Sequence, residues 1–508
     1  RSTAASTIWR PQIPSRGKYA VYISYRSLPN SSTSAHYTVH HMGGDSHFAV
    51  NQKMGGNTWI YLGTFEFAEG KSGYVTLDNR TPQGWRYSSG SVVSADAVRF
   101  GGGMGNVARG EIRDTSGVII SEPSVSGMPR SAEAARYWLQ WAGADTCVWH
   151  LNDGLNDYRD DFMSRGDWVE WLSRGSWMNP SGEGGKSIPF DISVGFHTDA
   201  GVTPDDSLVG TLAIYTLKSE RNTKLPSGED RLTNRDLAAA VQDQLIIDLR
   251  HDFDSLWSQR SIWDRGYRES RTPTSPSLLL ELLSHQNFAD MKYGLDPSFR
   301  FTVSRAIYKG MLKYMSNRYS RDYVVQPLPV DNVGVRFVSE DKAILNWKPV
   351  TDPYEPTASV NGYILYTRID DGAFDTGIDI REAHQNSDGS LSYEVKIEPG
   401  HIYSYKIAAY NDGGLSFTSE IVSIGRPEGC NSSKTVLVVN NFDRVSGPAF
   451  YDTPTNASFN NKTDSGVPYI NDIAYIGQQH DNVRCKPWVT DDNPGFGASA
   501  QDYAGKTV

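Results

Sequence analysis

The sequence is poor in cysteine, and its cysteines form no metal-binding motif. The 508 residues include only Cys147, Cys430 and Cys485, with no Cys-x-x-Cys pair. A zinc site built from thiolates is therefore disfavoured. Cys147 lies in an apolar stretch that we expect to form a buried strand. Cys430 and Cys485 could pair in an oxidising compartment, although nothing in the sequence requires it.

A positive charge excess and long apolar runs are also missing. There are 49 Lys and Arg residues against 59 Asp and Glu, which gives a net charge of −10. Nucleic-acid binding is disfavoured, because phosphate affinity needs a basic surface. No apolar run is long enough to span a bilayer. The chain begins at Arg1 without a methionine and ends in a Gly- and Asp-rich stretch, so we expect both ends to be cut from a longer protein.

Aromatic residues, in contrast, are abundant. They make up 11% of the chain, with 13 Trp and 27 Tyr. This content fits β-sandwich modules and sugar-facing surfaces, and aromatic cores would explain it equally well. At roughly 150 residues per domain, the length predicts three or four domains.

The residue pattern changes along the chain and predicts a multidomain α/β plus β protein. Residues 1–102 contain short alternating strands, which indicate an antiparallel β-sandwich. Residues 131–318 alternate strands and helices, which is typical of an αβα domain with a mostly parallel sheet. Residues 327–425 return to strands, and 434–508 open on an apolar strand over 434–440, as at the start of a further, partial α/β domain.

Within the αβα region the expected elements are regularly spaced. Strands are expected over 145–150, 188–197, 211–216 and 277–283, and helices over 131–140, 160–172, 234–256 and 299–315.

Two of these strands finish on a side chain suited to catalysis, His197 in the first and Glu281 in the second. Strand carboxyl ends are where open α/β sheets place their sites. A neutral imidazole is a good zinc ligand, and a carboxylate beside metal-bound water can accept its proton. The alternative is a buried histidine in a polar pocket and a glutamate in an ion pair.

The residues around this pair resemble the zinc-dependent N-acetylmuramoyl-L-alanine amidases with an αβα core. The resemblance rests on Ser193 to Ala200, on Glu281 followed by Asn287, and on the closing helix from Phe299 to Gly310. It implies that His197 binds zinc, that Glu281 is the general base, and that peptidoglycan or a related glycan-linked amide is the substrate.

That family has two further zinc ligands, and residues 131–318 do not contain them at the matching positions. His150 and His41 are the substitutes to consider. The simpler account is that the first half of the amidase domain precedes Arg1 and that the N-terminal sandwich is inserted within it.

A charged helix precedes the His197 strand, and it offers two possible substrate contacts. Arg159 and Arg165 could bind a peptide carboxylate. A solvated helix face with an i, i+4 ion pair explains the same residues, and we favour it.

Residues 1–102 resemble the golvesin or xanthan-lyase-type accessory domain, through Gly17 to Tyr25, Tyr37 to Gly44, Trp59 to Phe65 and Ala95 to Phe100. The resemblance implies an extracellular, polysaccharide-associated module. Carbohydrate binding, with Trp59 or Trp85 as stacking platforms, and a spacer role are both open.

Residues 327–425 resemble a fibronectin type III module, with Trp347, Tyr363 and Tyr405 as core aromatics. Modules of this kind are mostly spacers. The whole pattern predicts a secreted, periplasmic or cell-surface bacterial amidase-like hydrolase with one zinc ion. The alternative is a non-catalytic glycan-binding or scaffold protein with a degenerate amidase domain.

Overall fold

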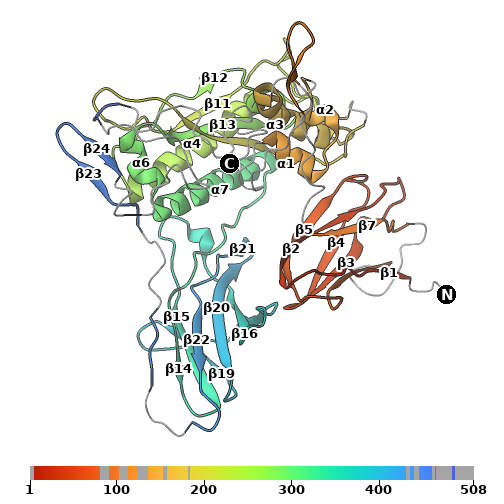
Figure 1. Cartoon of the computed structure of the whole chain (residues 1–508). Coiled ribbons are helices and arrows are strands. Elements are labelled where there is room, and N and C mark those ends of the chain that lie inside the picture. Colours follow the sequence, from red (N-terminus) through yellow and green to blue (C-terminus); the bar gives the residue numbers. More distant parts are fainter. Residues whose placement is uncertain are drawn as a thin grey trace. The chain divides into compact units, whose positions relative to one another are not determined.

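A computed structural model describes residues 5–79, 91–101, 112–122, 135–152, 157–180, 184–430, 435–439, 446–459, 464 and 483–486. The chain divides into two compact units, and each is treated by itself (Figure 1). The first unit contains residues 1–101 and 320–440, and the second contains 102–319 and 441–508.

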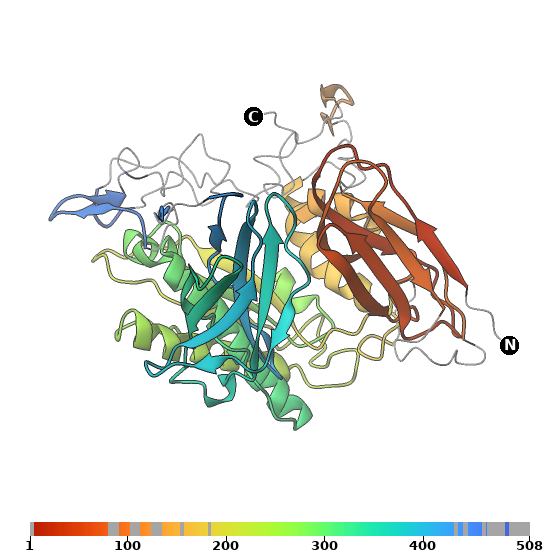
Figure 2. The same ribbon diagram turned by 90° about the horizontal axis from the view of Figure 1, so that it is seen from below.

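The N-terminal part of the first unit is an antiparallel sandwich, as the strand pattern predicts. One sheet has the order β1-β6-β3-β4 and the other β5-β2-β7 (Figures 1 and 2). The strands are β1 (Ser6–Trp9), β2 (Gly17–Ser24), β3 (Ala35–His41), β4 (Gly44–Val50), β5 (Ile60–Phe67), β6 (Tyr74–Asp78) and β7 (Ala97–Phe100). Alternate apolar residues of the two sheets, such as Val21, Tyr37 and Val75, form the core between them.

The second part of the first unit is another two-sheet sandwich. Its sheets have the orders β14-β15-β19-β18 and β17-β16-β20-β21, and β22 also pairs with β20. The strands are β14 (Asp331–Phe337), β15 (Lys342–Lys348), β16 (Gly362–Ile369), β17 (Ile378–Ile380), β18 (His384–Gln385), β19 (Leu391–Lys396), β20 (Ile402–Asn411), β21 (Gly414–Leu415) and β22 (Val422–Gly425). Trp347, Tyr363 and Tyr405 are buried in its core, which confirms their predicted place.

The second unit is built on a four-stranded sheet of order β10-β13-β11-β12. The strands are β10 (Ser193–Asp199), β11 (Leu212–Tyr215), β12 (Trp263–Asp264) and β13 (Ser277–Ser284). β10 and β13 are parallel and so are β11 and β12, but β11 and β13 are antiparallel. Two of the three strand pairings are thus parallel, in line with the predicted mostly parallel sheet, and the central pairing makes the sheet mixed. Only the four-residue helix α5 (Arg268–Arg271) separates β12 from β13, so β13 returns in the opposite direction without a long helical crossover.

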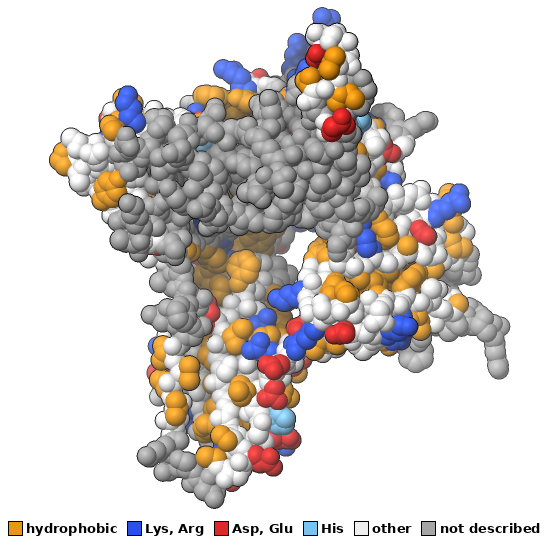
Figure 3. Space-filling model, in the orientation of Figure 1, with side chains coloured by type: hydrophobic (Ala, Val, Ile, Leu, Met, Phe, Trp, Pro, Cys, Tyr) orange, Lys and Arg blue, Asp and Glu red, His pale blue; other side chains and the backbone are white. Residues whose placement is uncertain are grey.

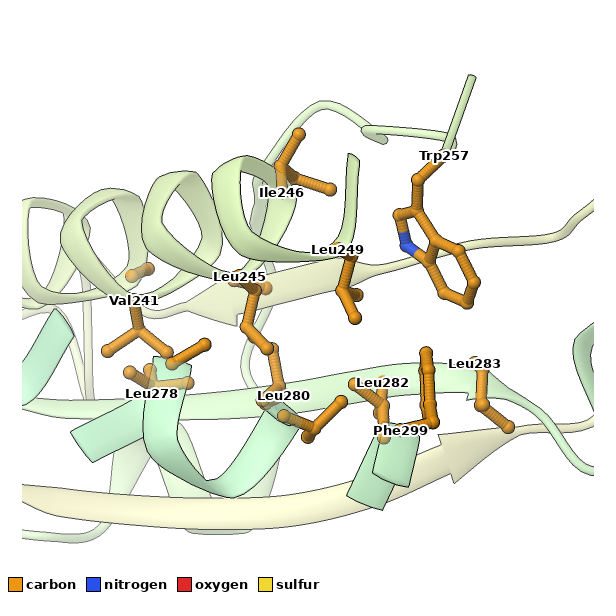
Figure 4. Packing of buried hydrophobic residues seen from close by; sticks show 14 of the residues in the cluster. Val241, Leu245, Ile246, Leu249, Trp257, Leu278, Leu280, Leu282, Leu283 and Phe299 are labelled. Atoms are coloured by element: carbon orange, nitrogen blue, oxygen red, sulfur yellow. The ribbon is translucent and has the colours of Figure 1, made fainter. Parts of the chain in front are cut away.

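Two long helices cover one face of this sheet. They are α4 (Leu232–Asp252) and α7 (Pro297–Tyr319), close to the helices predicted over 234–256 and 299–315. Figure 4 shows how Val241, Leu245 and Leu249 of α4 meet Leu278, Leu280 and Leu282 of β13, with Phe299 and Trp257 at one end. The 3.6-residue period of the helix and the two-residue period of the strand thus place both apolar faces in one core.

The other helices of the second unit are short, except for α3 with 17 residues. They are α1 (Ala135–Ala142), α2 (Thr146–Trp149), α3 (Asp157–Ser173) and α6 (Phe288–Gly294). None of the helices in the described residues is long and apolar enough to cross a membrane.

Two hairpins complete the second unit. One joins β8 (Ile112–Arg113) to β9 (Ile119–Ser121), and the other joins β23 (Phe450–Asp452) to β24 (Ala457–Phe459). Val118 and Ile120 are exposed, and hydrophobic side chains are visible on the β8–β9 hairpin in Figure 3. Phe459 is buried and belongs to the core beneath α4 and α7, so the second hairpin is anchored.

Two predicted strands are wrong. The stretch 145–150 forms helix α2, because the carboxylate of Asp145 accepts a hydrogen bond from the backbone N–H of Cys147 and caps the helix start. Cys147 is consequently exposed instead of buried, and all three cysteines are free thiols. Residues 435–439 are exposed and form no strand, since the described residues supply no neighbouring strand to complete their hydrogen bonds.

Replacing Leu280 by alanine tests the core of the second unit. Leu280 is fully buried between the sheet and the helices, so its loss should lower the free energy of unfolding by about 2–5 kcal/mol. Chemical denaturation measures this change. Leu256→Ala is the matched control, because that leucine is 83% exposed, and it should change stability by less than about 0.5 kcal/mol. Equal losses in the two variants would contradict the packing.

Candidate active site

His197 and Glu281 lie side by side on the sheet of the second unit. They are direct register partners on the parallel strands β10 and β13. Glu281 alternates with Leu280 and Leu282, which enter the core under α4 and α7, so the two site residues occupy the opposite face. The sequence predicts both residues at the ends of their strands. The structure places them inside β10 and β13 instead, and it brings them together.

A second glutamate, which sequence reasoning missed, contacts His197 directly. Oε1 of Glu269, in helix α5, lies 3.0 Å from Nε2 of His197. Gly195 of β10 allows this approach, because a Cβ at that position would lie 3.0 Å from Cβ of Glu269. The same carboxylate oxygen accepts a hydrogen bond from Nη1 of Arg165 at 3.1 Å. Arg165 also donates from Nη2 to Asp161 at 2.5 Å, which completes a four-residue network.

The two glutamates beside His197 have opposite electrostatic environments. Burial raises the pKa of Glu281, and Asp199 and Glu269 add to the rise against the opposing charges of His197 and Arg260. Oε2 of Glu281 is buried and has no hydrogen-bond partner among the described residues. Burial also acts on Glu269, but the hydrogen bond and charge of His197, together with Arg165, lower its pKa below the usual value. Glu281 therefore holds a proton more readily than Glu269 does.

Asp199 and Arg260 form an ion pair whose charges also act on Glu281. Asp199 ends β10 after an irregularity in the pairing, and its Oδ2 accepts a hydrogen bond from Nη1 of Arg260 at 2.6 Å. Its other oxygen accepts from the backbone N–H groups of Ala200 and Gly201. Burial alone would raise the pKa of Asp199, but Arg260 and these N–H groups outweigh it, so the pKa is lowered.

Asn287, part of the amidase-like motif, has a structural role. Its Nδ2 donates to Ser207 O at 2.8 Å and to Asp290 Oδ2 at 2.5 Å. Asp290 is buried and accepts hydrogen bonds from the backbone N–H groups of Val209, Gly210 and Ser284. The pair thus fixes the loop before β11 to the end of β13.

The two candidate substrate-binding arginines have different surroundings. Arg165 lies within the site, but its guanidinium is engaged by Asp161 and Glu269. Its pairing with Asp161 is the i, i+4 ion pair that the sequence analysis favours over substrate binding, although Asp161 is buried and the pair is not on a solvated face. Arg159 is exposed on the same helix.

The described residues hold no cluster of three or more His, Cys, Asp or Glu side chains arranged for a metal ion. His197 and Glu269 supply two donors of the kind zinc accepts, which is fewer than the three protein ligands of catalytic zinc sites. His150 follows α2 and stacks edge-on against Trp149, and His41 belongs to the first unit, where Nε2 contacts Ser46 Oγ. The remaining ligands would have to come from outside the described residues.

Of the two tryptophans considered as sugar-stacking platforms in the N-terminal sandwich, the structure describes Trp59 and not Trp85. Trp59 is half-buried, and the guanidinium of Arg99 stacks between its ring and that of Tyr22, at 4.7 and 4.4 Å. One face of Trp59 is therefore already covered. Trp85 lies outside the described residues.

Comparison with known proteins identifies the N-terminal module. Residues 1–102 match the Golvesin C-terminal domain, which confirms that resemblance. Xanthan lyase from Bacillus sp. (strain GL1) is 35% identical over 98 residues, which are 19% of this chain and 10% of that protein. The chain thus spans about a tenth of the length of this relative.

Two solved structures are also similar to part of this chain. The FN1–FN3 domains of chicken CNTN1 are 18% identical with a TM-score of 0.18, and the match covers 21% of this chain and 33% of that one. An N-acetylmuramoyl-L-alanine amidase from Clostridium difficile 630 is 16% identical with a TM-score of 0.21, over 25% of this chain and 59% of that one.

Because folding raises the pKa of Glu281 and lowers that of Glu269, replacing each by glutamine should change the free energy of unfolding in opposite directions. An acid whose pKa is raised by folding weakens the folded state above that pKa, so Glu281→Gln should stabilise the protein at neutral pH. The gain is about 1.4 kcal/mol for each unit of the rise and disappears below about pH 4, where the unfolded chain is also protonated. Chemical denaturation between pH 4 and 8 measures it.

Glu269→Gln should do the reverse. An acid with a lowered pKa stabilises the fold above its unfolded value of about 4.3, and this stability is lost as the pH falls through the folded pKa. Removing the charge that holds His197 and Arg165 should cost about 1–3 kcal/mol at pH 7. Glu220→Gln, at an exposed position, is the control. The same sign of change in both variants would refute the assignment.

Proposed function

We propose that the second unit is an amidase-like hydrolase of glycan-linked amides, with peptidoglycan as the first candidate substrate. The observation that carries this proposal is the register pairing of His197 with Glu281, together with the raised pKa of Glu281. A carboxyl group whose pKa is raised above its ordinary value is better suited to accept and return a proton during hydrolysis.

In this proposal Glu281 is the general base. Its buried oxygen Oε2 lacks a hydrogen-bond partner among the described residues, so it is available to a water molecule beside the substrate carbonyl. It would take the proton of the attacking water and return it to the leaving amine. His197 stands next to it, and in the metal-free site Nε2 of its imidazole is hydrogen-bonded to Glu269, which Arg165 also contacts.

His197 and Glu269 are the residues that would hold a zinc ion, with further ligands from outside the described residues. When bound, zinc supplies a Lewis acid that polarises the carbonyl and acidifies water. Nε2 of His197 and Oε1 of Glu269 lie 3.0 Å apart, so zinc binding would replace the hydrogen bond between these two atoms.

The similarity of residues 1–102 to a golvesin-type domain and to xanthan lyase supports an extracellular place of action. We assign the N-terminal module a role in holding the enzyme near an extracellular polysaccharide, either as a binding module or as a spacer. The fibronectin-like sandwich would act as a spacer.

A second candidate is a non-catalytic glycan-binding or scaffold protein. It is favoured by the closed network in which Glu269 pairs with both His197 and Arg165, since such networks also serve purely structural ends.

Metal analysis and an amide-hydrolysis assay separate the two candidates. The purified chain should contain one zinc ion, which His197→Ala should remove. Glu281→Gln should retain the zinc and lose at least about 100-fold in kcat, because the proton acceptor is gone. His251→Ala is the control, since this histidine is exposed on α4.

The hydrolase proposal fails if a zinc-supplemented preparation contains no zinc and hydrolyses neither muropeptides nor intact peptidoglycan. Unchanged turnover in Glu281→Gln would show that Glu281 is not the general base. Whether His197 binds zinc would then be decided by the zinc content of His197→Ala.

A further inference from the structure

We infer that the hairpin before α4 holds a binding site for a small oxyanion, a phosphate or carboxylate group, at Arg231 and Ser227. The site uses none of the residues that the proposed hydrolysis needs. It therefore stands or falls independently of the proposed function.

Arg231 is a buried cation. It is 5% exposed and directly precedes the 21-residue helix α4. Burial lowers the pKa of Arg231, and no charged group among the described residues counteracts this effect. The ordinary pKa of a guanidinium is so high that the group nevertheless keeps its charge.

The guanidinium of Arg231 also lacks hydrogen-bond partners. Its Nε and Nη1 atoms are enclosed, and neither donates to an acceptor among the described residues. Arg165, Arg268 and Arg318 of the same unit each pair with a carboxylate. A buried charge without a partner is strongly destabilising, so a counter-charge is expected at Arg231.

A second unsatisfied polar group belongs to the same hairpin. The hairpin is closed by hydrogen bonds from Leu225 N–H to Glu229 O and from Arg231 N–H to Thr223 O, both of 2.8 Å. Between them, Oγ of Ser227 is buried and has no partner in the described part of the chain. A hydroxyl and a guanidinium can both donate, so the fitting ligand is a negatively charged hydrogen-bond acceptor.

The carboxylates of the hairpin are already engaged elsewhere. Glu229 accepts hydrogen bonds from both Nη atoms of Arg318 in α7. Asp230 caps α4, because its Oδ1 accepts a hydrogen bond from Leu232 N–H at 2.9 Å. Neither carboxylate is among the groups that act on Arg231. A bound oxyanion supplies the charge that these two residues do not.

The position of the site gives the ion an effect on the sheet. Asn234, in the first turn of α4, donates from Nδ2 to Thr216 O at 2.8 Å and accepts from Ser277 N–H at 3.1 Å. It thus connects the start of α4 to the end of β11 and the start of β13. The positive end of the helix dipole also favours an anion here. An oxyanion on Arg231 therefore holds α4 against the strand that carries Glu281.

Hydrogen–deuterium exchange of the full chain tests the site. Sodium phosphate, sodium acetate and sodium chloride are compared at millimolar concentration and equal ionic strength, so that general charge screening is the same. Residues 223–234 should exchange at least about threefold more slowly in phosphate than in chloride, because an ion that binds only the closed hairpin reduces its opening. Acetate distinguishes the two sources: protection equal to that of phosphate indicates a carboxylate group, and weaker protection indicates a phosphate group.

Two variants and a control assign the effect to the hairpin. Arg231→Met should abolish the protection by phosphate, and in chloride it should exchange no faster than the unmodified chain, because it removes an unpaired buried charge. Ser227→Ala should require a severalfold higher phosphate concentration for the same protection. Arg235→Gln is the matched control, since this arginine is exposed on the same helix, and it should keep the full effect.

Equal exchange of residues 223–234 in phosphate, acetate and chloride would overturn the inference and assign the counter-charge of Arg231 to the chain itself. Protection that persists in Arg231→Met would overturn it as well. Loss of protection in Arg235→Gln to the same extent as in Arg231→Met would show a general attraction of anions to α4 and would contradict a site in the hairpin.

Discussion

The parallel pairing of β10 with β13 is the constraint on which the second unit depends. It buries Leu278, Leu280 and Leu282 against α4 and α7, and it places His197 beside Glu281 on the other face. Stability and site geometry therefore come from the same strand. A one-residue slip of β13 would move Glu281 into the apolar core and the leucines to the site, which strongly fixes the register.

The site is defined by charge as much as by position. Glu269 lies between a histidine and an arginine and is held ionised, whereas Glu281 is buried with an oxygen that lacks a partner among the described residues. Two carboxylates with environments of opposite effect are the usual arrangement where one residue must exchange a proton and the other must keep its charge. The expected destabilisation of the fold by the buried Glu281 carboxylate fits the general observation that active-site residues reduce the stability of the protein that holds them.

The sequence was informative where a long periodic segment carried the signal. The leucine pattern interrupted by Glu281 predicted β13, and the spacing of Leu237, Val241, Leu245 and Leu249 predicted α4. The site residues outside such segments could not be found this way. Glu269 sits in a four-residue helix and Arg260 in an irregular segment, and both reach the site only through tertiary packing.

The errors have physical causes of the same kind. Thr146 to Trp149 has the β-branched and aromatic composition of a strand, but the cap supplied by Asp145 turns it into a helix. The one antiparallel pairing of this sheet, between β11 and β13, was not predicted either, because strand direction depends on how the chain connects the strands and local pattern does not encode it.

The most direct test of the central claim is a pH titration of the glutamate carboxyl carbons by ¹³C NMR. The account predicts that Glu281 titrates above the ordinary glutamate value of about 4.3 and Glu269 below it. His197→Ala should raise the pKa of both, because its charge favours both carboxylates. Ordinary pKa values for both residues, or the reverse order, would contradict the arrangement of charges on which the site depends.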